Sequence, residues 1–324
     1  MRWLALPLLC LYLPVALAKT ILVVESYHAG FKWDQDYRRA LSEALTPGHT
    51  LEFFEMDTKR LAEEKHAAMG QKAVARIKKS TPALVVMGDD AALKYVGPEL
   101  DRLGIPGVYL GINNNPRNYV RESYGHITGV LERPLIKRNV AFIQQLVPAI
   151  QKVQILFDGN FTSEVIRNEV FGGKLATQLN GIQIDLKICK TVNDWKQAVR
   201  DAQSNGYQIT VVGLYQALTG PNNRIANDED IITWTSAHTP VPLFAIWDFS
   251  VGPDKAIGGL VMTGAEQGKA AASIVRKILE NKTEPARIFP QTTTLGSFVF
   301  SRKQLARFGI RLPSEIANRA KLTD

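Results

Sequence analysis

Side chains able to do chemistry collect where short apolar runs of this sequence end. One run finishes at Glu25 and is followed by Ser26-Tyr27-His28, and another finishes at Met87 and is followed by Gly88-Asp89-Asp90. Hydroxyl, carboxylate, amide and aromatic groups can hold a small molecule by hydrogen bonding and ring stacking. The candidate site residues are Ser26, Tyr27, His28, Trp33, Asp89, Asp90, Asn113, Asn114, Asp158, Phe161, Tyr215, Trp247 and Asp248.

The same residues do not form a catalytic pattern. No GxSxG nucleophile motif, no P-loop and no GxGxxG after the first apolar run occur in the chain. The histidines show no metal-ligand spacing such as HxxxH; they are His28, His49, His66, His126 and His238. Asp89 and Asp90 are adjacent, and adjacent carboxylates at a strand end more often cap a helix than share a proton. We therefore predict a binding protein rather than an enzyme, with no cofactor and no metal.

Several candidates also have a purely structural interpretation. Trp33 and Tyr37 are four residues apart, the spacing of a helix stripe that faces a core. Trp247 ends the apolar run PLFAIW and fits a buried strand end. Asn113 and Asn114 are residue types common in turns, although their place after an apolar run favours a site.

Short β-branched runs alternate with amphipathic stretches, which predicts strands alternating with helices. In the first half we expect strands over 20–25, 50–56, 83–87 and 106–110, and helices over 33–45, 69–79 and 91–96, the last capped by Asp89 or Asp90. In the second half we expect strands over 153–157, 182–189, 209–214, 242–247, 258–262 and 297–300, and helices over 135–146, 163–179, 192–203, around 231–234 and over 264–280. Two βα sets follow one another, each with a parallel sheet covered on both faces.

This pattern explains why the candidate residues belong together. The carboxyl ends of parallel strands meet at one edge of a sheet, where loops and helix N-termini gather around ligands. The loops 26–30, 88–90, 111–116, 158–163, 215–216 and 247–250 all follow predicted strands. They carry more aromatic and amide groups than ordinary turns need.

The first eighteen residues differ from the rest. Met1-Arg2 is a short basic start, an apolar stretch follows, and Ala16-Leu17-Ala18 is the small-x-small pattern of a signal-peptidase cut. The stretch is shorter than the roughly 20 residues that span a bilayer and contains two prolines, so we predict a cleaved signal peptide over 1–18 rather than an anchor. Cleavage would leave Cys189 alone, and its alternating strand pattern predicts a buried, inert thiol. An exported protein of this size without disulfides suits the periplasm.

Charge does not indicate a nucleic-acid partner. The formal net charge is +8, but the basic residues are scattered beside apolar ones at helical spacing. Export to the periplasm argues against nucleic acid as well. We read these residues as solvated helix faces.

Several segments resemble a known family. They are ILVVESYHAGFKWDQDYRRAL, PALVVMGDDAAL, INNNP followed by GHITGVLERP, VQILFDGNFTSEV and FSRKQLARFGIRLPSEIANRAKL. In order and spacing, over nearly the whole mature chain, the sequence resembles the periplasmic substrate-binding proteins of ABC importers, in the tryptophan/tyrosine-type branch with the type I periplasmic-binding-protein fold.

The resemblance implies two doubly wound α/β lobes joined by a hinge, closing around a small molecule. Carried over, the first lobe would hold 20–127 and 253–288, and the second 128–252 and 289–324. Aromatic walls would come from Tyr27, Trp33, Tyr215 and Trp247, and polar contacts from Asn113, Asn114, Asp158 and Asp248. The family often has Asp-Pro where this chain has Asn115-Pro116, and Asn where it has Asp158, so a polar solute other than an amino acid stays open.

Three functions follow as hypotheses. The first is a monomeric periplasmic receptor that captures a small polar or aromatic, amino-acid-like molecule and delivers it to an ABC permease. The second is a ligand-sensing co-receptor for a membrane sensor kinase or diguanylate cyclase. The third, an exported enzyme, would turn its bound compound over.

Overall fold

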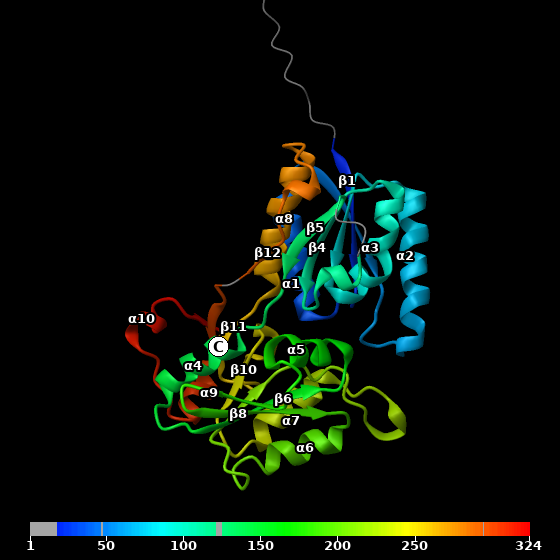
Figure 1. Ribbon diagram of the computed structural model, residues 1–324. Helices are drawn as coiled ribbons and strands as arrows, with labels where there is room; N and C mark the ends of the chain where they lie inside the picture. Colours follow the sequence, from blue (N-terminus) through cyan, green and yellow to red (C-terminus); the bar gives the residue numbers. More distant parts are fainter. Residues whose placement is uncertain (1–17, 47, 121–124, 294) are drawn as a thin grey trace, which may run out of the picture.

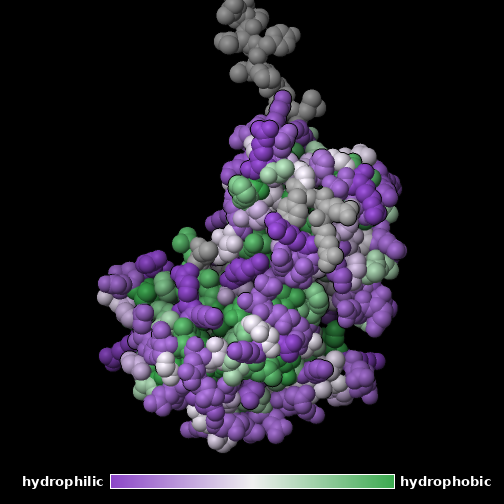
Figure 2. Space-filling view, in the orientation of Figure 1, coloured by the Kyte–Doolittle hydropathy of each residue, from purple (hydrophilic) through white to green (hydrophobic). Residues whose placement is uncertain are grey.

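The computed structural model describes residues 18–46, 48–120, 125–293 and 295–324, which form two α/β lobes stacked one above the other in Figure 1. The predicted signal peptide lies outside the described residues except for Ala18. Hydrophilic residues cover most of the face seen in Figure 2.

The first lobe contains a six-stranded, wholly parallel sheet in the order β12-β5-β4-β3-β1-β2. Its strands are β1 (Lys19–Glu25), β2 (His49–Glu55), β3 (Leu84–Gly88), β4 (Gly107–Ile112), β5 (Ile127–Leu131) and β12 (Gln291–Thr292). Its helices are α1 (Lys32–Leu45), α2 (His66–Ser80), α3 (Asp89–Leu103) and α8 (Gly264–Leu279).

Helices cover both faces of this sheet, because neighbouring strand residues point to opposite sides. Ile21 belongs to the apolar cluster that includes Tyr37 of α1, whereas Leu22 belongs to the cluster that includes Ile77 of α2. Figure 1 shows α1 and α8 on one face and α2 and α3 on the other. The predicted doubly wound arrangement is therefore present.

The second lobe contains a five-stranded sheet in the order β10-β9-β6-β8-β7, in which only β7 runs antiparallel to its neighbour. Its strands are β6 (Lys152–Asp158), β7 (Ala176–Leu179), β8 (Ile182–Cys189), β9 (Ile209–Val212) and β10 (Leu243–Ala245). Its helices are α4 (Ile136–Leu146), α5 (Phe161–Phe171), α6 (Val192–Arg200) and α7 (Asp228–His238). Cys189 is buried as predicted, and burial raises the pKa of its thiol to about 12.

A small third sheet lies beside β10 in the second lobe. It consists of β11 (Gly258–Val261), β13 (Ser297–Phe300) and β14 (Lys321–Leu322), with the short helices α9 (Arg302–Arg307) and α10 (Ser314–Ala317). Backbone hydrogen bonds from Ile257 to Leu243 (2.7 Å) and from Met262 to Ile246 (2.9 Å) attach it to β10.

The chain passes between the lobes three times, between β5 and α4, between β11 and α8, and between β12 and β13. Strand pairing puts β5 and β12 in the first sheet and β11 next to the second. These pairings favour lobe boundaries several residues later than the predicted 127/128, 252/253 and 288/289.

Two predicted helices differ from the structure. The helix expected over 163–179 ends at Phe171, because Gly172 and Gly173 both adopt left-handed backbone angles, and residues 176–179 form β7 instead. The helix expected over 91–96 runs on through Pro98 to Leu103. Neither Asp89 nor Asp90 caps it; its N-cap residue is Gly88, and the hydroxyl of Ser26 accepts the Ala92 N–H instead (2.8 Å).

Candidate functional site

The carboxyl ends of the two sheets face each other across the junction between the lobes. In the first sheet the strand order reverses between β1 and β3, and in the second between β6 and β9, which is where an α/β sheet opens a crevice. Two contacts show that the loops from opposite lobes meet. The ring of Phe31 lies 5.3 Å from that of Phe249, and the Lys94 ammonium lies 5.5 Å from the ring of Phe161.

Aromatic side chains from both lobes form one continuous group, called here the aromatic cluster: Tyr27, Phe31, Phe157, Tyr215, Trp247 and Phe249. Tyr27 meets Phe31 edge-on at 5.5 Å, and Trp247 stacks on Phe249 at 6.0 Å with an interplanar angle of 12°. The rings come from the ends of β1, β6, β9 and β10. Such a group can hold a flat or apolar molecule between its faces.

Lys59 places a positive charge on this cluster. Its ammonium lies 4.3 Å from the ring centre of Tyr27 and 4.8 Å from that of Phe31. Burial lowers the pKa of Lys59, while carboxylates of both lobes, Asp158 and Asp89 foremost, act in the opposite direction. A cation held over ring faces can also bind an anionic group of a ligand.

Glu132 joins residues from both lobes at the hinge side of the cluster. One carboxylate oxygen accepts the Trp247 indole N–H at 2.6 Å, and the other accepts the Asn113 amide at 2.9 Å. Burial raises the pKa of Glu132 to about 7, and these two hydrogen bonds act against the rise.

Four of the predicted residues use their polar atoms to hold loops within their own lobe. The Ser26 hydroxyl donates to the Gly88 carbonyl at 2.6 Å, besides accepting the N–H from α3. Asp90 accepts the backbone N–H groups of Asn113 and Asn114 at 3.0 and 3.1 Å. Asn114 accepts from its own turn and donates to Tyr119. Buried Asp158 accepts from Ser163, Asn160 and Ala217, at 2.7, 3.2 and 2.9 Å in that order. These side chains shape the loops.

Trp33 and Asp89 also pair with each other. The Trp33 indole N–H donates to Asp89 at 3.2 Å, and burial, followed by the nearby Asp34, raises the pKa of Asp89 well above its ordinary range. Trp33 is buried among core residues, so the structure supports the core-stripe interpretation for it.

The remaining predicted residues lie on or beside the cluster. Tyr27, Tyr215 and Trp247 belong to it, and half-buried His28 lies against Phe31, its pKa lowered by burial. Phe161 is half exposed at the opposite edge, and Asp248 turns toward Lys32 at 3.8 Å.

Some polar atoms here have no hydrogen-bond partner within the described part of the chain. Among them are Oδ1 of Asn113 and Nε2 of Gln216, an acceptor in the first lobe and a donor in the second, and also Oδ1 of Asp248. A ligand carrying both a donor and an acceptor would satisfy them.

Six of these residues were not among the predicted site residues: Phe31, Lys59, Glu132, Phe157, Gln216 and Phe249. Gln216 and Phe249 do lie in the loops expected to follow strands. Phe31, Phe157 and Phe249 lie one or two residues from predicted positions. Glu132 follows β5, a strand that was not predicted, and the rule that sites follow strands would have found it. No local sequence pattern points to Lys59 as a site residue, because its approach to Tyr27 depends on how the loop after β2 folds back.

Comparison with known proteins identifies the fold class of the chain. The first lobe, the second lobe and their three connections match the two-lobed fold of type I periplasmic binding proteins. A protein from Streptococcus pneumonia, solved in complex with L-Trp, has a TM-score of 0.69 at 16% identity, covering 95% of this chain and 100% of its own.

Two further solved structures share the fold. The ligand-free, open form of a substrate-binding protein with adhesive properties from Clostridium difficile has a TM-score of 0.66 at 13% identity, covering 95% of this chain and 100% of its own. An ABC transporter solute binding protein from Agrobacterium vitis with bound allitol has a TM-score of 0.52 at 14% identity, covering 86% and 93%.

A family model described as ABC transporter substrate binding protein matches residues 110–323, and the chain belongs to that family. No curated protein matches the sequence. Among the described residues, no helix has the length and apolar character needed to cross a membrane. The described residues also hold no group of three or more His, Cys, Asp or Glu side chains placed to bind a metal ion.

Proposed function

We propose that this protein captures a small polar or aromatic, amino-acid-like molecule between its lobes in the periplasm and delivers it to the permease of an ABC importer. The observation that carries the proposal is the aromatic cluster, whose rings come from the ends of strands in both lobes and touch across the junction. A molecule lying between Phe31 and Phe249 would part the two rings and bury its own faces against both.

Polar recognition would come from the atoms that are left without partners. Asn113 Oδ1 would accept a hydrogen bond from a ligand ammonium or hydroxyl, and Gln216 Nε2 would donate to a carboxylate or carbonyl. Lys59 would add a charge for an acidic group. Closure then exchanges solvent for contacts to both lobes, and the permease recognises the closed form.

The first experiment is a panel of amino acids, nucleosides and sugars measured by thermal shift on the mature protein. A ligand that binds only the folded state raises the melting temperature. Phe249→Leu keeps an apolar side chain in the buried position but removes the ring, and we expect it to weaken binding of the stabilising compound by about tenfold.

Phe289→Ala is the matched control, because Phe289 is 87% exposed and lies outside the cluster. Equal affinity of wild type, Phe249→Leu and Phe289→Ala would show that the cluster is not the binding site. Uptake of the same compound by cells lacking the protein tests delivery to the importer, and unchanged uptake would contradict it.

A further inference from the structure

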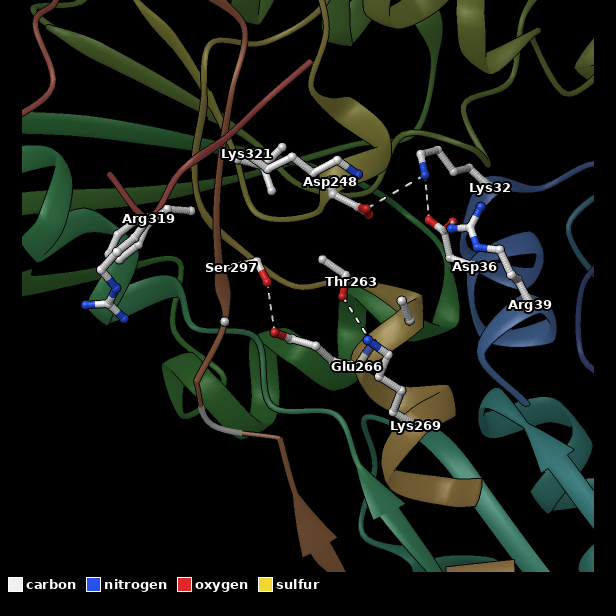
Figure 3. Close-up of a pocket in the computed structure, with 14 residues that line it drawn as sticks. Lys32, Asp36, Arg39, Asp248, Thr263, Glu266, Lys269, Ser297, Arg319 and Lys321 are labelled. Atoms are coloured by element: carbon white, nitrogen blue, oxygen red, sulfur yellow. Dashed lines mark hydrogen bonds and ion pairs between the residues drawn. The ribbon is translucent and has the colours of Figure 1, made fainter. Parts of the chain in front are cut away.

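A hollow of about 390 Å³ lies on the hinge side of the molecule, between the start of α1, the start of α8 and the third sheet. Its volume falls in the lower part of the range of small-molecule sites. In Figure 3 the side chains of Lys32 and Lys321 point toward Asp248, whereas Arg319 lies at the far edge and points away from them. The lining residues that carry charge are Lys32, Asp36, Arg39, Asp248, Glu266, Lys269, Arg319 and Lys321.

Cations outnumber acids in this lining by five to three, and the acids already have partners. Asp36 pairs with Lys32 at 2.5 Å and with Arg39 at 2.6 Å. Glu266 accepts the Ser297 hydroxyl at 2.9 Å, as the dashed line in Figure 3 marks. Lys32 also faces Asp248, so these five charged residues, two cations and three acids, carry a formal net charge of −1.

The other three charged residues, Lys269, Arg319 and Lys321, are all cations and bring the formal net charge of the hollow to +2. Within the described ranges of the chain, none of the three has a carboxylate within ion-pair distance. Arg319 lies over the ring of Phe298 at 5.6 Å. Lys269 acts to lower the pKa of Glu266 and Lys321 acts to lower that of Asp248, so each lysine faces one carboxyl of the hollow from beyond ion-pair distance. The N-terminal turn of α8, a sixteen-residue helix, adds the positive end of its dipole through Ala265.

We infer that this hollow binds a small multivalent anion bearing phosphate or carboxylate groups, held chiefly by Lys269 and Lys321. Lys269 belongs to α8 in the first lobe, and Lys321 belongs to β14 in the third sheet beside the second lobe. An anion between them contacts both sides of the hinge and stabilises this arrangement of the lobes. The inference does not depend on the proposed function, because the hollow and the aromatic cluster use different side chains.

The test is calorimetric titration of the mature protein with citrate and with inorganic phosphate at constant ionic strength. Both anions also stabilise proteins by exclusion from their surface, so binding heat rather than melting temperature is the readout. The variant is Lys269→Gln/Lys321→Gln. Lys277→Gln/Lys174→Gln is the control, because it removes two exposed lysines outside the hollow, one of them on α8 as well.

We expect saturable binding to wild type and control, and at least about a tenfold weaker binding to the variant. Circular dichroism confirms that the variant is folded. The inference is overturned if all three proteins bind the anions equally, or if none gives saturable heat with free anions and all three bind vesicles alike. Vesicles of phosphatidylglycerol in phosphatidylcholine identify the source of the anion: loss of vesicle binding in the variant alone, with none to free anions, assigns the site to a lipid headgroup.

Discussion

Glu132 shows how a single buried side chain can tie two lobes together. It is only 2% exposed, yet each of its oxygens accepts a hydrogen bond, from Trp247 on one side and from Asn113 on the other. A buried carboxylate that loses a donor retains its desolvation cost without the compensating bond. A substitution of Trp247 or Asn113 should therefore cost stability, in addition to any ligand contact that it removes.

Replacing Glu132 with Gln should change how stability depends on pH. The pKa of Glu132 is raised from 4.5 to about 7, so the folded protein holds this proton to higher pH than the unfolded chain does. Its contribution to the unfolding free energy is therefore largest below pH 4.5 and declines as pH rises to about 7. Because Gln does not titrate, the difference between wild type and variant should change by up to about 1.4 kcal/mol per pH unit within that window.

Urea unfolding at several pH values measures this difference, and Glu284→Gln is the control because Glu284 is exposed. Wild-type and Glu132→Gln stabilities that run parallel from pH 5 to 7 would contradict the assignment.

The candidate residues illustrate what can be read from residue type. Rules about strand ends led to Tyr27, Tyr215 and Trp247, which do lie in the cluster. The same rules could not separate them from Ser26 and Asp158, because a polar group that organises a loop and one that awaits a ligand have the same sequence appearance. The two kinds of residue can be distinguished only by the hydrogen-bond partners of their polar atoms in the structure.

At the scale of elements, the alternation of strands and helices was predictable because each buried strand has its own apolar run. The strand β5 was missed because Thr128 and Gly129 interrupt its apolar pattern. Gly129 is required there by packing, since an added Cβ would stand 2.1 Å from the Tyr109 carbonyl oxygen on β4. Contacts between strands distant in sequence leave no mark on the local pattern.

The helices α1 and α8 pack closely through Gly268, and Gly268→Ala should destabilise the protein. A Cβ at this position would lie 2.7 Å from the Tyr37 carbonyl oxygen and 2.9 Å from the Ala40 Cβ, so the two helices would have to move apart. Alanine raises helix propensity by about 1 kcal/mol, but overpacking against backbone costs about 1–3 kcal/mol. We expect a net loss of stability.

Chemical denaturation of Gly268→Ala measures that loss. Gly48→Ala provides the comparison, because nothing lies within 4 Å of a Cβ added at Gly48. If Gly268→Ala is as stable as wild type, α1 and α8 can move apart without lowering the free energy of unfolding, which would contradict the prediction.

For the molecule as a whole, the function depends on how far apart the lobes stand. The described arrangement brings Lys94 to Phe161 at one edge and Lys32 to Asp248 at the other, so the lobes are in contact on both sides of the aromatic cluster. The two-lobed architecture could be predicted from the family resemblance. The points at which the chain crosses between the lobes could be located only from the strand pairings of the structure. For example, residues 291–292 pair with β5, although more than half of the second lobe's sequence lies between the two strands.

Asp248 allows closure to be tested through pH. Burial raises its pKa from 3.8 to about 6, and Lys32 lowers it by a smaller amount. If opening returns Asp248 to water, its pKa falls toward the ordinary value, and the closed form is then the one that binds a proton more tightly. Lowering the pH from 7 to 5 should therefore favour the closed form, by about tenfold at most, even though protonation weakens the ion pair with Lys32.

Distances between spin labels at Lys79→Cys in the first lobe and Gln203→Cys in the second measure this shift, since both positions are exposed and native Cys189 is buried. Asp248→Asn should lose the pH response, while Asp254→Asn, which alters an exposed ion pair with Lys303, should keep it. If the lobes instead open at low pH, the attraction between Lys32 and Asp248 in the closed form is larger than the cost of burying the Asp248 charge. Protonation of Asp248 would then remove a net attraction between the lobes.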